Sequence, residues 1–451
     1  MADLRQRRPP GPQYYWFFKA SKLQHHPIEA LGSLWHEYGD LVRLPIMPGL
    51  TFYLASHPDY AEHILATHSD LYGKPDTLLK SMGLVQGQGL FTSEGEFWRH
   101  NRRLIQPAFH HSQLHHFHDV ILQCTNALLQ EWEQKPAGEI IDIAAEMTRL
   151  TLKIIGLALF SVDISDDANV LGKALRTAIE YVYYRMAAPL ALPVGVPTHR
   201  NRRFRQAKQT IDRVVQSLIQ ARRQNPTQQH DLLAMLLAAQ DEETGQGMSD
   251  RQLQDEMITL INAGHETSAT TLAWTWYLLG THPDAMAAIA DEVQTVLNGH
   301  PLTYEALPRL QYTRRVLDES LRLRPPGLGL MRQAYEADEI HGYFIPKGAN
   351  CIVGQYFILR HPDFWENPDR FDPDRFLPEK VACRPKFAYL PFGAGPHVCI
   401  GKNLALMELV MILAGITQRF HVDLVPDQVI EVDPRFTLRP RGGVKVNVRA
   451  R

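Results

Sequence analysis

The sequence has little cysteine, and its few cysteines form no pattern. Of the 451 residues only four are cysteines, Cys124, Cys351, Cys383 and Cys399, and no two of them lie in a Cys-x-x-Cys pair. A disulfide framework or a zinc ribbon would need more cysteines or a closer spacing. Reduced thiols are typical of the cytoplasm, so we expect a cytoplasmic protein.

Long hydrophobic runs and an excess of charge of one sign are also absent. No stretch of about 18 apolar residues occurs, so no transmembrane helix is expected. Prolines interrupt the basic N-terminus, which argues against an export signal. The 47 basic and 49 acidic side chains nearly balance, so nucleic acid is not expected as a partner. Residues 14–18 and the basic run 199–208 are candidates for membrane contact, and the alternative is a buried aromatic cluster and a solvated helix face.

Helical periodicity dominates the chain from about residue 97 to residue 324. Strand signals flank this region: residues 41–46 and 51–56 predict a hairpin, and further strands are predicted at 333–340, 349–354 and 444–448. We therefore predict a mainly α fold with a minor β lobe (α+β), whose sheet is built from both ends of the sequence. A single domain is expected over residues 1–451, with strand-rich parts at about 35–60, 333–360 and 428–448 and helices in most of the rest.

The segment from Ser249 to Gly280 predicts one long helix. Ser249 and Gln252 have the spacing of a capping box, and Pro283 follows the end of the helix. A helix of about 31 residues is roughly 46 Å long, which is enough to cross a whole domain.

The centre of this helix departs from helix preferences. Gly264 lowers helix stability there, and Glu266 is costly to bury. Ala263 and Thr267 lie four residues apart on one face. One interpretation is that this face admits a flat ligand, with the Thr267 hydroxyl and the Glu266 carboxyl as a proton-donating pair. The other is that Thr267 hydrogen-bonds to the carbonyl of Ala263 while Glu266 points to solvent.

Cys399 lies in the glycine-rich loop FGAGPHVCIG, residues 392–401, directly before an apolar stretch of helical character. A structural buried cysteine does not need the three glycines around it. A nucleophilic cysteine needs a base, for which His397 is available, but nothing else nearby indicates a hydrolase. A zinc ligand needs companion ligands, which are missing. An axial thiolate to haem iron needs none, because the porphyrin supplies four ligands.

These motifs resemble those of the cytochrome P450 haem-thiolate monooxygenases, and the resemblance covers nearly the whole chain. The loop is similar to the family's cysteine loop at Phe392, Gly395, His397, Cys399 and Gly401, with histidine at 397 as the less common choice. The long helix matches the family's oxygen-binding motif at Ala263, Gly264, Glu266 and Thr267. Further on, the chain has the three residues of the family's ion-paired triad, Glu319, Arg322 and Arg375.

The resemblance implies a haem b cofactor with Cys399 as its axial thiolate. The two haem propionates need cationic or N–H partners, and the family's positions for them correspond to Trp98, Arg102, Arg332 and His397. Phe392 and Gly401 in the loop, and Ala263 and Gly264 on the long helix, are expected beside the haem. The triad is expected to be structural rather than catalytic.

The resemblance also implies the reaction and the partners. One atom of dioxygen is inserted into a C–H bond of an apolar, medium-to-large substrate, with Thr267 and Glu266 as the proton relay. Electrons are expected from NAD(P)H through a separate reductase and a ferredoxin or flavodoxin. A basic face for this partner is expected at Arg99, Arg103, Arg384, Lys386 and Lys402.

The substrate is expected to be a fatty acid, a terpenoid or a polyketide. Segments corresponding to the family's pocket are mainly apolar and span about 78–91, 181–188, 328–331 and 436–438. Lys80 and Arg185 are the charged exceptions that a fatty-acid carboxylate would use. The alternative functions are a peroxide-driven haem-thiolate peroxygenase and a non-catalytic haem-thiolate sensor.

Overall fold

The computed structural model of the chain describes residues 7–16, 20–136, 138–161, 165–187, 192–224, 231–241, 245–434 and 436–451. The chain divides into two compact units, and each unit is discontinuous in sequence. Unit 1 contains residues 1–76 and 318–399, and unit 2 contains residues 77–317 and 400–451. Parts of the predicted segments 14–18 and 181–188 lie outside the described residues.

Unit 1 is built around a five-stranded sheet with the order β1-β2-β8-β5-β3. Its strands are β1 (Leu41–Met47), β2 (Leu50–Ala55), β8 (Asn350–Val353), β5 (Leu330–Ala334) and β3 (Tyr72–Gly73). The predicted hairpin is confirmed, since β1 and β2 pair in antiparallel register from Leu41 opposite Ala55. Strand β8 joins the hairpin in parallel with β2, because it arrives from a distant part of the sequence rather than from a turn.

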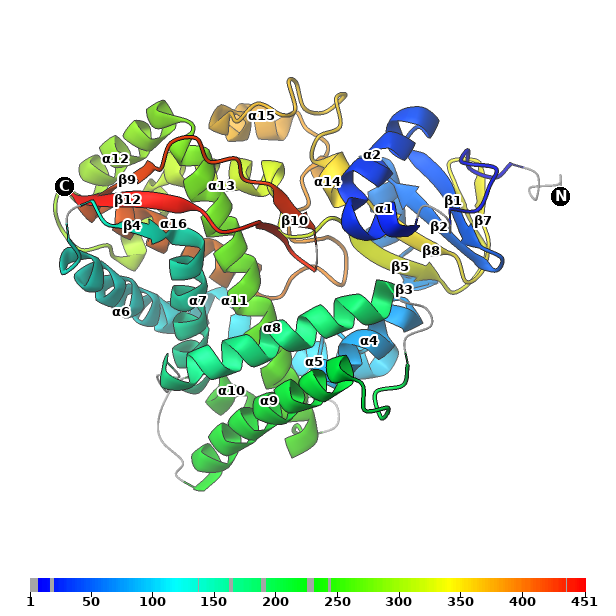
Figure 1. The fold of residues 1–451 in the computed structure, drawn as a ribbon, viewed down its shortest axis with the longest axis horizontal. Coiled ribbons are helices and arrows are strands. Elements are labelled where there is room, and N and C mark those ends of the chain that lie inside the picture. The colour runs from blue at the N-terminus through cyan, green and yellow to red at the C-terminus, as the bar shows by residue number, and fades with distance from the viewer. Residues whose placement is uncertain are drawn as a thin grey trace. The chain divides into compact units, whose positions relative to one another are not determined.

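Helices and a second hairpin complete unit 1. They are α1 (Ala20–His25), α2 (Pro27–Tyr38), α3 (Pro58–Glu62), a π-helical turn (His63–Thr67), α14 (Gln355–Ile358), α15 (Pro378–Ala382), β6 (Asp338–Ile340) and β7 (Tyr343–Ile345). Figure 1 shows α1 and α2 beside the sheet. Leu31 and Leu34 of α2 pack with Val42 and Leu54 of the hairpin in one buried cluster. Burial of these apolar side chains holds α2 against the sheet.

Unit 2 is mainly helical. Its helices are α4 (Asp76–Gln86), α5 (Gly95–Ile105), α6 (Leu114–Glu133), α7 (Ile143–Phe160), α8 (Ser165–Ala187), α9 (His199–Gln224), α10 (Leu232–Ala238), α11 (Asp250–Gly280), α12 (Pro283–Leu297) and α16 (Lys402–Arg419), while α13 (Gln311–Leu323) contributes residues to both units. Within this unit α8 and α9 lie side by side, and α11 packs most extensively against α7 (Figure 1). Among the described helices none is long and apolar enough to cross a membrane.

The prediction of one sheet built from both ends of the sequence is wrong for the C-terminal strands. Strand β12 (Lys445–Ala450) pairs with β9 (Phe420–Leu424) and β4 (Ile140–Asp142), and β10 (Val432–Pro434) pairs with β11 (Leu438–Pro440). These strands belong to unit 2, not to the unit that holds the N-terminal hairpin. Strand β9 directly follows α16, so β12 finds its partner close by in sequence and buries Val446 and Val448.

The predicted long helix is confirmed as α11. The Ser249 side chain accepts a hydrogen bond from the Gln252 N–H at 3.2 Å, so the N-cap forms as expected. Gly264 is explained by packing, because a Cβ atom added there would lie 2.7 Å from Cδ1 of Ile155 in α7. The glycine therefore lets α7 approach α11, while the neighbouring Ala263 is exposed.

Candidate active site

The cysteine loop is ordered by its own backbone. The Cys399 N–H donates to the carbonyl of Phe392 at 3.0 Å, and the Val398 N–H donates to that of Gly395 at 3.1 Å. Gly393 and Gly395 have φ values of 72° and 68°, in the region that favours glycine. The side chain of Cys399 is exposed. The loop therefore presents an accessible thiol from a fixed backbone.

Gly395 is required by a close approach as well as by its φ angle. A Cβ atom built on Gly395 would overlap the carbonyl oxygen of Leu65, in the π-helical turn of the same unit. Gly401 is different, since its φ of −84° is ordinary and an added Cβ would lie 4.0 Å from the Phe109 ring. Thus Gly395 shapes the loop, whereas the backbone geometry does not require glycine at 401.

The other cysteines are poorer candidates for a metal ligand. Cys124 and Cys351 are buried, and burial raises the pKa of Cys351 to about 12. Cys383 is exposed at the end of α15 but has no glycine loop around it. A metal ligand must be an accessible thiolate, and Cys399 meets this need best.

The four predicted propionate partners lie on three elements. Trp98 and Arg102 stand one turn apart on α5, with Trp98 buried and Arg102 half-buried beside Gln106. Arg332 lies on β5, where its guanidinium donates to the Met331 carbonyl at 2.9 Å. His397 is half-buried in the cysteine loop, as is Phe392. Their contact with a haem stays a prediction.

The structure at the centre of α11 agrees in part with each of the two interpretations made from the sequence. The Thr267 hydroxyl donates to the Ala263 carbonyl at 2.8 Å, as expected for a helix-bound threonine. Glu266 does not simply point to solvent: it is half-buried, and its Oε1 accepts a hydrogen bond from the Thr437 hydroxyl at 2.6 Å. Thr437 follows β10 and was not identified from the sequence as a partner of Glu266.

The predicted ion-paired triad is confirmed within unit 1. Arg322 forms a forked contact with Glu319, at 2.7 Å and 2.9 Å, and both side chains are fully buried. Arg375 adds an ion pair to Glu319 at 3.4 Å. Burial raises the pKa of the Glu319 carboxyl, while Arg322 lowers it. Because the guanidinium contacts both carboxylate oxygens, we infer that the pair is ionised and structural.

A second buried carboxyl joins two helices of unit 2. Oε2 of Glu408, in α16, accepts a hydrogen bond from the Ser268 hydroxyl of α11 at 2.7 Å. Burial raises the pKa of Glu408 to about 8, and the hydrogen bond from Ser268 offsets only part of this effect. The carboxyl is therefore mainly protonated at neutral pH.

Replacement of Glu408 by glutamine is expected to remove a pH dependence of stability. The unfolded carboxyl releases its proton above about pH 4.5, whereas the folded one keeps it until about pH 8. Stability of the wild type therefore falls with rising pH across this window, by up to about 1.4 kcal/mol per pH unit. Glutamine does not ionise, so calorimetry should show the variant gaining melting temperature over wild type between pH 5 and pH 8. A difference in melting temperature between the variant and the wild type that stays constant from pH 5 to pH 8 would contradict the raised pKa of Glu408. The exposed replacement Glu131→Gln serves as the control.

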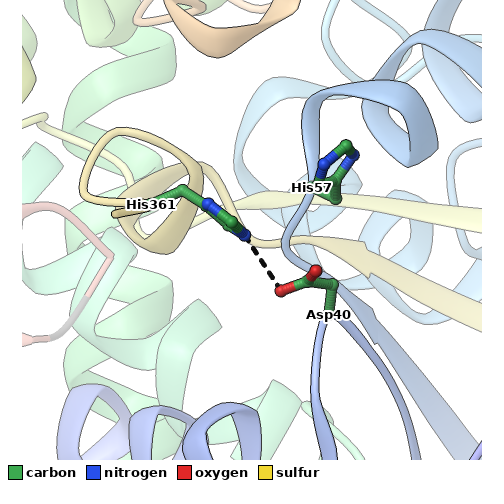
Figure 2. A group of neighbouring side chains, drawn as sticks. All are labelled: Asp40, His57 and His361. Carbon is green, nitrogen blue, oxygen red and sulfur yellow. Dashed lines mark hydrogen bonds and ion pairs between the residues drawn. The ribbon is translucent and has the colours of Figure 1, made fainter. Parts of the chain in front are cut away.

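Three side chains of unit 1 form a cluster that the sequence did not indicate (Figure 2). Nε2 of His361 lies 3.1 Å from Asp40 Oδ1, and His57 lies beside them. The Nδ1 atoms of His57 and His361 accept backbone N–H groups of Asp59 and Asp363, at 3.2 Å and 3.3 Å. Each neutral ring therefore carries its proton on Nε2, which a metal ion would have to displace. The cluster is better explained as a hydrogen-bonded network than as a metal site.

Three members of the predicted basic face have partners inside their own units. Arg99 forms an ion pair with Glu96, and both of these side chains are exposed. Arg103 pairs with the buried Asp241 at 3.0 Å. The Arg384 guanidinium lies 3.8 Å from the centre of the Trp365 ring and donates to the Arg375 carbonyl. The contacts of Arg103 and Arg384 stabilise the units themselves. Lys386, Lys402 and Arg99, whose ion pair with Glu96 lies on the surface, are therefore the better candidates for partner contact.

Comparison with known proteins agrees with these motifs. The sequence matches the family described as Cytochrome P450 over residues 9–448. It is 36% identical to cyclooctat-9-en-7-ol 5-monooxygenase of Streptomyces melanosporofaciens, over 90% of this chain and 87% of that protein. It is 31% identical to pentalenene oxygenase of Streptomyces avermitilis, over 90% of this chain and 89% of that protein.

Comparison of structures gives the same result. The chain resembles the crystal structure of the cytochrome P450DA heme domain with a TM-score of 0.88 and 29% identity, covering 98% of both chains. The mainly α fold with its minor sheets is therefore that of this family, as the sequence predicted. The chain belongs to the cytochrome P450 family and is a monooxygenase with a haem-thiolate cofactor.

Proposed function

We propose that the protein hydroxylates an apolar terpenoid, using a haem b whose iron is bound by Cys399. The observation that carries this proposal is the pair of relatives named as oxygenases of terpenoids, which align with about nine-tenths of this chain. Within unit 2 the predicted pocket segments bring together two aromatic rings, Phe91 and Phe436, with their centroids 6.4 Å apart. Aromatic and apolar surfaces of this kind suit a hydrocarbon substrate.

The contacts of Arg185 argue against a fatty acid as the substrate. Its guanidinium donates to the carbonyl of Leu192 at 2.6 Å, so it already has a partner in the protein. Lys80 is exposed on α4. A carboxylate-bearing substrate would have to compete for Arg185, whereas a terpenoid would not need it.

The side chains present fit a haem. An accessible cysteine in a rigid loop supplies the axial ligand, and the proposed propionate partners are Trp98, Arg102, Arg332 and His397. Phe392, Gly401, Ala263 and Gly264 would flank the haem without offering charged groups. When bound, the haem activates dioxygen for insertion into a C–H bond.

The remaining chemistry falls to the side chains of α11. Glu266 is the proposed proton source, and the Thr267 hydroxyl is the proposed donor facing the site. Thr267 now donates to the Ala263 carbonyl, so its hydroxyl must turn away from that carbonyl to donate a proton elsewhere. Glu266 must likewise exchange its hydrogen bond with Thr437 for one that leads toward Thr267.

Electrons are proposed to come from NAD(P)H through a reductase and a ferredoxin or flavodoxin in the cytoplasm. Exposed Arg99, Lys386 and Lys402 are the proposed cationic contacts for an acidic partner. Peroxygenase activity would not need these proteins. Product formation that depends on the electron-transfer partners and not on added peroxide therefore separates the two functions.

The experiment is a titration of the haem-loaded protein with compounds of each class. A cyclic terpene hydrocarbon is expected to shift the iron spin state, and a long-chain fatty acid of similar carbon number serves as the control. Mass spectrometry of the reconstituted reaction should then show addition of one oxygen atom to the terpene. Tighter binding and oxidation of the fatty acid would overturn the terpenoid assignment, and absence of product from every class would overturn the enzyme's proposed role.

A further inference from the structure

Two elements of unit 1 contact the backbone of the cysteine loop. One is the π-helical turn, because a Cβ atom added at Gly395 would overlap the Leu65 carbonyl oxygen. The other is β5, because a Cβ atom added at Gly393 would lie 3.4 Å from Cδ1 of Leu330. The hydrogen bonds within the loop fix its shape, whereas these two contacts fix where the loop lies. The place of Cys399 in unit 1 therefore depends on the π-helical turn and on β5.

The π-helical turn is held by contacts outside its own backbone. Turns of this kind are rare and occur mostly singly, often at functional sites. This one is closed by the His68 N–H, which donates to the His63 carbonyl at 3.0 Å. The rings of the same two histidines stack with their centroids 3.9 Å apart, and Ile64 and Leu65 between them are buried. The His63 side chain thus lies at the start of the turn and helps to fix it.

One carboxylate oxygen joins this turn to the sheet. Oδ2 of Asp338, in β6, lies 2.7 Å from Nε2 of His63. The same oxygen accepts a hydrogen bond from the Tyr72 hydroxyl at 2.6 Å. Tyr72 is buried in β3, which pairs in antiparallel register with β5. Asp338 therefore links the π-helical turn to the pair of strands that carries Leu330.

The carboxyl of Asp338 is ionised at neutral pH. Its side chain is only 10% exposed, and burial alone would raise the pKa of the carboxyl. Hydrogen bonds from Tyr72, His63 and the Glu339 N–H outweigh burial, so the pKa lies below its ordinary value. An ionised carboxylate only accepts hydrogen bonds, so Nε2 of His63 carries a proton and donates it to Asp338. Such charge-assisted hydrogen bonds are roughly twice as strong as neutral ones.

We propose that Asp338 is a positioning residue for Cys399, and that its bonds to His63 and Tyr72 hold together the two elements on which the cysteine loop rests. The inference rests on the proposed function, in which Cys399 binds the haem iron. None of the three side chains has to touch the haem, because they act through the backbone of the loop. Loss of this bridge lets the loop move, which weakens the bond from sulfur to iron and gives protons access to the sulfur.

The first test measures the loop by hydrogen exchange in the haem-loaded protein. His63→Ala removes the donor on the turn, and Tyr72→Phe removes only the hydroxyl that reaches Asp338. In each variant the amides of residues 393–399 are expected to exchange about tenfold faster than in the wild type. Loss of either bond opens the bridge, so the double variant should exchange no faster than the faster of the two single variants.

Two further variants serve as controls. His63→Gln keeps an N–H donor near the position of the imidazole Nε2, so its loop should exchange nearly like that of the wild type. His361→Ala removes a matched contact elsewhere in unit 1, where the Asp40 carboxylate lies 3.1 Å from His361 and accepts from the Trp35 N–H at 2.8 Å (Figure 2). This variant should lose melting temperature without loosening the loop. If it loosens the loop as much as His63→Ala does, the effect is a general loss of stability and the positioning role is wrong.

The second test follows the thiolate. In His63→Ala and Tyr72→Phe the thiolate band of the reduced carbon monoxide complex should decay about tenfold faster than in the wild type at the same temperature. The haem reduction potential should become more positive, because a displaced sulfur donates less electron density to iron. His63→Gln should show neither change.

The outcomes of this test separate the positioning role from the proposed function. If both variants keep the wild-type decay rate and potential, Asp338 does not position Cys399, whatever the variants lose in melting temperature. Tyr72→Phe, the milder change, decides the question if His63→Ala does not take up haem. Absence of the thiolate band from the wild type would instead overturn the proposed function.

Discussion

Replacement of Cys399 by serine is expected to abolish turnover and the red-shifted absorption band of the reduced carbon monoxide complex. A serine hydroxyl is not ionised at neutral pH and is a far weaker axial donor than a thiolate. The loop itself should survive, because its hydrogen bonds come from backbone groups and its turns from Gly393 and Gly395. Absorption spectra of the purified variant, with and without carbon monoxide, give the measurement.

The other cysteines provide the controls for this experiment. Cys383→Ser changes the second exposed thiol and should leave both the band and the activity intact. Cys351→Ser changes a buried thiol and tests general damage to the fold. A Cys399→Ser protein that keeps the thiolate band would assign the ligand to another cysteine.

Replacement of Glu319 by glutamine is expected to cost about 3–5 kcal/mol of stability. The change leaves Arg322, which is fully buried, without its carboxylate. Loss of a charged partner inside a protein is far more costly than loss of a surface pair, because water does not replace it. Urea unfolding of the haem-loaded variant would measure the change, and a lower haem content in the purified protein should accompany it.

An exposed ion pair gives the matched control. Glu131 and Arg149 lie on the surface of unit 2, with side chains 51% and 46% exposed. Glu131→Gln should cost under about 1 kcal/mol. If Glu319→Gln costs as little as this control, the buried triad does not stabilise unit 1 in the way its geometry indicates.

Features with local signals were predictable from the sequence. The ends of α11 follow from a capping serine at 249 and a glycine before Pro283, both of which act within a few residues. Glu319 and Arg322 are three apart on one helix, so their contact depends on helical geometry. The hairpin of β1 and β2 is likewise set by its turn.

Features that depend on distant contacts were not predictable in this way. Thr437 and Glu266 are 171 positions apart, and His361 and Asp40 are 321 apart. Gly264 could be identified as unusual, but only the packing of Ile155 explains it. The partners of β12 were assigned wrongly because a strand pattern specifies which face is buried and not which strand lies alongside it.

The discontinuous units restrict how this chain can be recombined with its relatives. The division falls after residues 76, 317 and 399, so any single crossover divides at least one unit between the two parents. The crossover at 317 would also interrupt α13 just ahead of Glu319. A chimera that takes unit 1 whole from one parent and unit 2 whole from the other needs three junctions, the middle one moved to an end of α13. Libraries built with single junctions should therefore yield few folded enzymes, and those with all three should yield more.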